Sequence, residues 1–171
     1  MSKLFWGEAM CKSQVYQEID FDKAFQRTLS KLEKKGICIL ATSVNDKVTA
    51  RSISIVIYDE KIAFQTSENT EKFQQIEQNQ NVGLSIDNFQ IIGQAKIKAH
   101  PFKEEKFIGR FKQKHAGSFK NYSDMKSERV VEVIPLEIKS WTYIEKEPFI
   151  MTLNVGKRTA FIEAYKHSPD D

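Results

Sequence analysis

Four polar residues around a short turn have the types and spacing that could bind a phosphate group. Thr66 and Ser67 end an apolar stretch, and Thr70 and Lys72 begin a segment with helical periodicity. A helix N-terminus presents free backbone N–H groups and the positive end of the helix dipole, so hydroxyls and a lysine beside it suit an anion. Ordinary helix capping by Asn69 or Thr70, with Lys72 in solvent, explains the same residues equally well.

Arg51 is the second chemically unusual residue. It lies in the stretch 48–57, where alternation places it on the same face of a strand as Ile53, Ile55 and Ile57. A buried unpaired guanidinium would be very costly, so Arg51 either pairs with a carboxylate at the rim of the fold or contacts an anion. The polar turn follows one hairpin later and can lie beside it, and arginine suits bidentate contacts with phosphate.

The elements that must position these residues follow from hydrophobic periodicity. Asp20 can cap the first helix and Gly36 can end it. Helices are predicted over 21–35, 70–79 and 102–115, with a short one over 157–166; strands are predicted over 37–44, 48–57, 61–66, 81–87, 89–99 and 129–145. Pro135 breaks the last strand or marks a sheet edge. Short strands joined by tight turns predict a mainly β fold, a β-barrel with peripheral helices.

The whole chain sets further limits. Its 171 residues predict a single domain, 1–171, with an N-terminal arm over 1–20. The net charge of +3 comes from interspersed acids and bases, so no nucleic-acid partner is expected. No apolar run is long enough for a signal peptide or a membrane span, so we expect a cytoplasmic protein without a membrane partner.

The cysteines and histidines do not predict a reactive site. Cys38 lies in an apolar run and is expected in the core, whereas Cys11 could be an exposed thiol. His100, His115 and His167 are far apart and lack metal-ligand spacing, so no metal is expected. For Trp141 and Tyr143 packing is favoured over a flavin contact, and packing of Trp6 against a partner subunit is a weaker hypothesis.

The segment "GICILATSVNDKVTARSISIVIYDEKIAFQTSENTEKFQQIEQNQNVGLSI", followed by "IIGQAKI", resembles the pyridoxamine 5′-phosphate oxidase-like flavoproteins, the FMN-binding split barrels. The resemblance covers about residues 21–100 and continues weakly through "VIPLEIKSW". It implies that the cofactor is FMN and that the protein is a homodimer with flavins at the subunit interface. It also implies the FMN contacts Arg51, Ser52, Ile53, Ser54, Thr66, Ser67, Lys72 and Gln94.

The resemblance implies a flavin-dependent oxidoreductase that acts on a small-molecule substrate or electron donor, with no catalytic side chain identified. Glu71 departs from the family pattern because an acid stands where an arginine often precedes the helix lysine. The C-terminal "AYKHSPDD" lacks the arginine and histidine that grip the substrate of pyridoxamine phosphate oxidases. Two alternatives stay open: a haem-binding split barrel, with His100 as the candidate ligand, and a barrel that binds a cofactor without turnover or has lost it.

Overall fold

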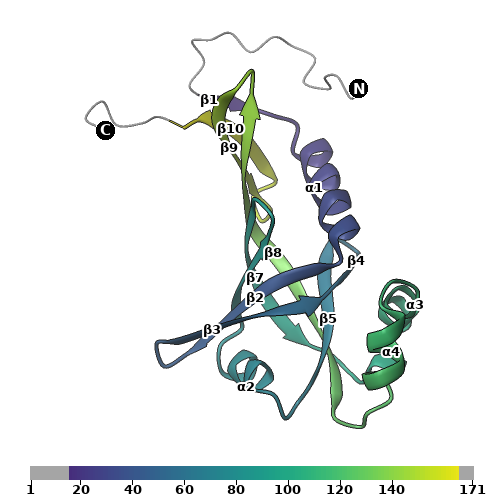
Figure 1. Ribbon diagram of the computed structural model, residues 1–171. Helices are drawn as coiled ribbons and strands as arrows, with labels where there is room; N and C mark the ends of the chain where they lie inside the picture. The colour runs from purple at the N-terminus through teal and green to yellow at the C-terminus, as the bar shows by residue number, and fades with distance from the viewer. Residues whose placement is uncertain (1–15, 166–171) are drawn as a thin grey trace.

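The chain is described as a computed structural model that covers residues 16–165 (Figure 1). Cys11, Trp6 and His167 lie outside these residues, as does most of the predicted N-terminal arm. The strands are β1 (Tyr16–Glu18), β2 (Ile37–Val44), β3 (Lys47–Ser54), β4 (Val56–Tyr58), β5 (Lys61–Ser67), β6 (Asn81–Ile86), β7 (Phe89–Ile97), β8 (Glu128–Ile144), β9 (Glu147–Asn154) and β10 (Thr159–Ala164). The helices are α1 (Phe21–Lys35), α2 (Glu71–Gln78), a 3-10 turn (Pro101–Lys103), α3 (Glu105–Lys114) and α4 (Ala116–Tyr122).

All ten strands belong to one antiparallel sheet that curls without closing. The main path runs β1-β10-β9-β8-β7-β6-β2-β3, and β5 joins it through β8 while also pairing with β4. β8 connects the two halves because its first residues pair with β5, its middle with β7 and its end with β9. The structure confirms the prediction of a mainly β fold and shows that it is a split barrel.

The register explains where the core lies. Leu40, Leu84, Ile91 and Ile138 are cross-strand neighbours on β2, β6, β7 and β8, and all four are buried on the inner face. α1 adds the buried Leu32 and its other apolar residues to the same cluster. Cross-strand pairs point to one face of a sheet, so a single row of aliphatic residues fills the barrel.

The helices cover separate parts of the barrel (Figure 1). Asp20 caps α1 through the N–H of Lys23 at 2.9 Å, and Gly36 ends it with φ of 72°, as the sequence predicts. α3 packs Phe107 and Phe111 over the outer side of β4 and β5 in a second cluster. α2 lies at one end of the barrel, between the β2–β3 hairpin and β5, and thereby places the polar turn next to β3.

Three predicted elements differ from the structure. The stretch 48–57 is interrupted at Ile55, whose N–H donates to the Gly36 carbonyl at 2.8 Å and whose carbonyl contacts His115 Nε2 at 2.9 Å. These bonds take the backbone of Ile55 out of the ladder and divide the strand into β3 and β4. The predicted helix 102–115 is a 3-10 turn followed by α3, and α4 continues beyond it.

The prediction of a helix over 157–166 is wrong, because residues Thr159–Ala164 form β10. β10 pairs with β9 along its whole length and with β1 on its other side. Its buried residues Ala160 and Ile162 show strand alternation, and the open edge of β9 supplies hydrogen-bond partners that the local sequence does not reveal.

Pro135 does not end β8. It faces Gly93 at a β-bulge, where the register between β7 and β8 shifts. The other edge of β8 is unpaired there, because pairing with β5 ends at Val133 and pairing with β9 begins at Glu137. A proline lacks an N–H and is tolerated at such an edge and bulge. Of the two predictions for Pro135, the sheet edge is therefore the correct one.

Candidate functional site

Arg51 is held by hydroxyl groups at the end of the barrel. It lies on the inner face of β3, and its Nη1 donates to Thr42 Oγ1 at 2.6 Å while Nη2 donates to Thr49 Oγ1. Arg51 forms no ion pair within 4 Å in the part of the chain that the structure describes. Burial lowers the pKa of Arg51, and the nearby Glu71 opposes this shift. Three of its five guanidinium N–H groups remain for another partner.

Gln75 of α2 completes this hydrogen-bond network. Its Oε1 accepts from Thr49 Oγ1 at 2.8 Å and from Thr42 Oγ1, so both hydroxyls that hold Arg51 are themselves oriented by one amide. Gln75 is 2% exposed, and its Nε2 has no hydrogen-bond partner among residues 16–165. Sequence reasoning missed Gln75, Thr42 and Thr49. The usable signal is that Gln75 follows Lys72 by three residues and therefore shares its helix face.

Lys72 lies beside Arg51 in the first turn of α2. The pKa of its half-buried amino group is lowered by burial and by repulsion from Arg51, while attraction to Glu128 opposes the shift. No carboxylate among the described residues is within 4 Å of it. The fold therefore holds two cations close together without a paired acid, which favours binding of an anion between them.

The hydroxyls of the turn are hydrogen-bonded to one another and to neighbouring groups of the chain. Thr70 Oγ1 donates to the Ser67 carbonyl at 2.8 Å, so its contact of 3.0 Å with Thr66 Oγ1 uses the Thr66 proton. Ser67 Oγ donates to Ser127 Oγ at 3.0 Å and accepts from the Asn69 N–H at 3.2 Å. These hydroxyls fix the turn, and no side chain caps α2. The Phe73 N–H donates to the Thr70 carbonyl at 3.1 Å, so the N–H groups of Glu71 and Lys72 are the ones in this turn that are available to an anion.

Glu71 does not oppose an anion as strongly as its position suggests. Its Oε1 accepts from Nζ of Lys47, in the β2–β3 hairpin, at 2.7 Å, and this lysine lowers the pKa of Glu71. Both side chains are more than half exposed, so the pair is screened by water. The net charge of this pair is zero. The cationic character of the site therefore comes from Arg51 and Lys72.

The sequence matches the family described as pyridoxamine 5′-phosphate oxidase over residues 23–142. This span contains the barrel strands β2–β7, all three helices after α1 and most of β8. The chain belongs to the pyridoxamine 5′-phosphate oxidase-like family. The comparison with curated proteins found no matching relative.

Solved structures of low sequence identity share the family fold. Campylobacter jejuni ChuZ aligns with a TM-score of 0.68 at 14% identity, covering 88% of this chain and 68% of that one. A pyridoxamine 5′-phosphate oxidase-related, FMN binding protein from Nostoc punctiforme aligns with a TM-score of 0.57 at 13% identity, covering 85% and 95%. General Stress Protein 26 from Bacillus anthracis gives 0.55 at 18% identity, covering 76% and 98%.

The positions that the family resemblance assigns to the flavin ring divide between the two faces of β3. Ser52 is exposed and Ser54 half-buried on the outer face, whereas the Ile53 side chain is buried in the core. Only the backbone of Ile53 can therefore reach a ligand. β3 ends the strand order of the sheet. A ligand that contacts both Arg51 and Ser52 must therefore pass the edge of β3.

Gln94 does not join the Arg51 cluster within one chain. It is exposed on the outer face of β7, between Asn81 and Ile134 in the register. Three strand steps separate β7 from β3 in the sheet order, which corresponds to ~14 Å at the usual spacing. The structure therefore brings Arg51, Thr66, Ser67 and Lys72 to one end of the barrel and leaves Gln94 on another part of the surface.

The described histidines are engaged in structural hydrogen bonds. His100 Nδ1 accepts from the Phe102 N–H at 3.3 Å, and its Nε2 contacts the Met125 carbonyl at 3.1 Å. An iron ligand would need one of these nitrogens free, so the geometry does not favour the haem alternative. No group of three or more possible metal-ligating residues occurs within residues 16–165. In the same range, no helix is both long and apolar enough to cross a membrane.

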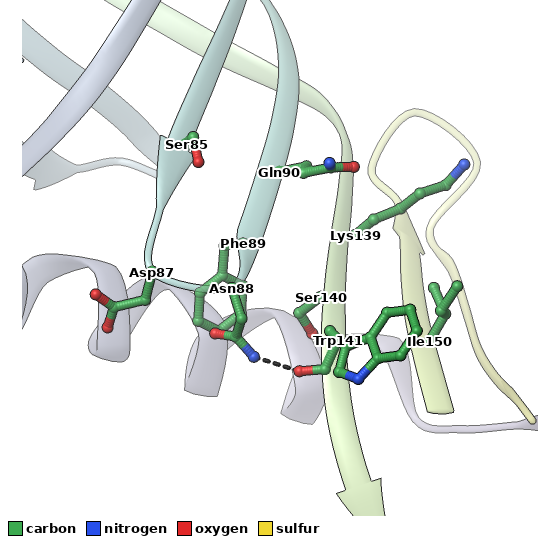
Figure 2. Close-up of a pocket in the computed structure, with 9 residues that line it drawn as sticks. All are labelled: Ser85, Asp87, Asn88, Phe89, Gln90, Lys139, Ser140, Trp141 and Ile150. Atoms are coloured by element: carbon green, nitrogen blue, oxygen red, sulfur yellow. Dashed lines mark hydrogen bonds between the residues drawn. The ribbon is translucent and has the colours of Figure 1, made fainter. Parts of the chain in front are cut away.

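A separate hollow of about 220 Å³ lies on the outer face, near the turn between β6 and β7 (Figure 2). Trp141 and Ile150 line one side of it, and Asn88 donates to the Trp141 carbonyl. Its charged groups are paired, Asp87 with Lys35 at 2.6 Å and Lys139 with Glu137 at 3.3 Å. Its volume is below the usual range of ligand pockets. The lining residues do not include Arg51 or Lys72.

Proposed function

We propose that this protein binds FMN and that Arg51, Lys72 and the N-terminal turn of α2 hold the phosphate group of the cofactor. The observation that carries this proposal is the close pair of cations, neither of which forms an ion pair within 4 Å among the described residues. A phosphate group would relieve the repulsion between Arg51 and Lys72, and its oxygens would accept hydrogen bonds from the unused N–H groups of Arg51. The donor set therefore fits a phosphate monoester, and the FMN binding named for the Nostoc protein supports this choice of ligand.

The remaining part of the cofactor would lie along the edge of β3. Ser52 and Ser54 are the polar side chains on the outer face there, and the backbone edge of β3 offers further donors and acceptors. When bound, the isoalloxazine ring supplies the electron-accepting chemistry of a flavin-dependent oxidoreductase. The residues of this chain bind and orient the cofactor, and a small organic molecule or electron donor is the substrate class that we propose.

A homodimer is part of the same proposal. The outer face of β2, β3, β7 and the middle of β8 exposes six large aliphatic side chains, Ile37, Ile39, Val48, Ile92, Ile134 and Leu136. An exposed apolar face of this kind favours association. A second copy would cover it and would bring a second chain, including the region around Gln94, toward the β3 edge of the first.

The phosphate assignment can be tested by comparing FMN with riboflavin, which lacks the phosphate. We expect the wild-type protein to retain flavin absorption through gel filtration with FMN and to bind riboflavin much more weakly. Removing one charge-assisted contact costs about 1.5–3 kcal/mol, or roughly 10- to 150-fold in Kd. Arg51→Ala and Lys72→Ala should each weaken FMN binding by this factor and leave riboflavin binding nearly unchanged.

Lys106→Ala is the matched control, because it also removes one positive charge, from an exposed lysine of α3 that pairs with Asp59. It should bind both flavins as the wild type does. Equal affinities of the wild type for FMN and riboflavin would contradict a phosphate site. The dimer is tested by light scattering: Ile92→Lys should shift the mass toward the monomer, and Tyr122→Lys on α4 should not.

A further inference from the structure

Glu128 is a buried carboxylate without a close partner. It is the first residue of β8, it faces Ser67 in the register with β5, and it is 5% exposed. Glu132 lies four residues later in the same strand and is equally buried at 5%. Its carboxylate accepts from Tyr58 Oη and Lys61 Nζ, both at 3.0 Å. The side chain of Glu128 has no such hydrogen bond and no ion pair within 4 Å among the described residues. The residue is mostly buried, but its carboxylate oxygens are not among the fully buried unpartnered atoms, so they keep some contact with solvent. Ionising a mostly buried carboxyl that has no ion-pair partner is unfavourable, so a change in the charges around it can protonate it.

The charged groups that act on Glu128 are Lys72 from α2 and Arg129 from its own strand. Arg129 is already engaged, because it pairs with Glu68 at 2.8 Å and donates to the carbonyls of Lys126 and Glu128, both at 2.8 Å. Lys72 is therefore the cation that remains for Glu128. Arg51 also acts on Lys72, so the site contains two positive groups and one negative group.

We propose that Glu128 belongs to the phosphate site and takes up a proton from solvent when a phosphate group binds to Arg51 and Lys72. This inference rests on the proposed function. Without a ligand the carboxylate attracts Lys72 without forming an ion pair within 4 Å. A dianionic phosphate takes over that role and repels a second anion, so the carboxylate becomes a neutral acid whose O–H can donate a hydrogen bond to the ligand.

The electrostatics of the site agree with this exchange. Burial raises the pKa of Glu128 to about 7, while Lys72 and Arg129 oppose the shift. The ligand-free carboxyl is therefore half ionised near neutral pH, and a phosphate that draws Lys72 away raises its pKa further. Affinity for the phosphate should then fall as the pH rises from about 7 toward the higher pKa of the complex. A phosphate monoester with a second pKa near 6 is about nine-tenths dianionic at pH 7 and more so above it, so its own titration adds only a small slope, in the opposite direction.

The test measures FMN and riboflavin binding between pH 6.5 and 9, with calorimetry in two buffers that differ in ionisation enthalpy. The wild type should lose FMN affinity as the pH rises, with a limiting slope of tenfold per unit for one proton, and should take up as much as one proton per FMN. Riboflavin should cause no uptake. Glu128→Gln imitates the neutral acid, so it should bind FMN at pH 8.5 as tightly as the wild type does at pH 6.5, without a slope.

Glu77→Gln is the control, because Glu77 is an exposed acid of α2 that is not among the charged groups acting on Glu128. It should keep the wild-type slope. Proton uptake by the wild type with FMN but not with riboflavin tests the proposal even where Glu128→Gln does not fold. If FMN binds more tightly than riboflavin but without proton uptake, the role of Glu128 alone is overturned. If FMN and riboflavin bind equally well, the proposed function is overturned, and the role of Glu128 with it.

Discussion

Gln75→Glu is a sensitive perturbation of the site, because it changes charge with almost no change in shape. Gln75 Oε1 accepts from the two hydroxyls that accept from Arg51, so two hydrogen bonds in series separate it from the guanidinium. Two such bonds span at most about 5.5 Å. A glutamate can accept the same two hydroxyl protons, and it replaces the unpartnered buried Nε2 by an oxygen.

The magnitude follows from Coulomb's law. At about 5.5 Å and an effective dielectric constant near 20, the new carboxylate attracts Arg51 by ~3 kcal/mol. A phosphate on the far side of Arg51 would be about 8 Å from the carboxylate, so each of its charges is repelled by ~2 kcal/mol. We therefore expect FMN affinity to fall by at least about 30-fold, while the free energy of unfolding stays equal to that of the wild type or rises.

The assay is FMN titration followed by flavin fluorescence, together with urea denaturation of the same samples. Gln78→Glu is the matched control, because it adds the same charge one turn later on α2, at an exposed position. It should bind FMN within about threefold of the wild type. A folded Gln75→Glu protein with wild-type FMN affinity, or an equal loss in Gln78→Glu, would refute the role given to the network around Arg51.

Two further predictions concern the barrel itself. A Cβ at Gly93 would lie 2.6 Å from Val133 Cγ1 and 2.8 Å from the Ile134 carbonyl oxygen, so Gly93→Ala should lower the free energy of unfolding by about 1–3 kcal/mol. Gly83→Ala meets only Ala41 Cβ at 3.8 Å, and urea denaturation should show a change of less than about 1 kcal/mol; equal losses in both variants would contradict this reasoning. Burial raises the pKa of Cys38 to about 12, so the folded state keeps the proton, and stability should fall as the pH rises above ~8.5, where the unfolded thiol ionises. In a Cys11→Ser background, a thiol reagent at pH 8 should modify Cys38 only after unfolding, and rapid labelling of the native protein would contradict the burial of this thiol.

The local sequence determined most of the barrel. Alternation and turn residues located β2, β5, β6 and β7, and the helix signals Asp20 and Gly36 bounded α1 because capping depends on neighbouring residues alone. The same local reasoning failed for β10, whose sequence also suits a helix. It forms a strand because it pairs with β9 and β1. β1 lies far from it in the sequence, and β9 was not predicted as a strand from the sequence.

The candidate site likewise contains residues that the sequence identified and residues that only the tertiary structure revealed. The sequence alone identified Arg51 as a charge on an apolar face and Lys72 as a helix-start cation, because both follow from periodicity along a single element. Only the tertiary structure decided that α2 lies against the β2–β3 hairpin. This contact joins Gln75 to the two threonines that hold Arg51, and it pairs Glu71 with Lys47. It is also the pairing of β5 with β8 that brings Glu128, 56 residues after Lys72 in the chain, to the same charge cluster. Hydrogen bonds and charges act over a few ångströms in space, and sequence separation gives no measure of that distance.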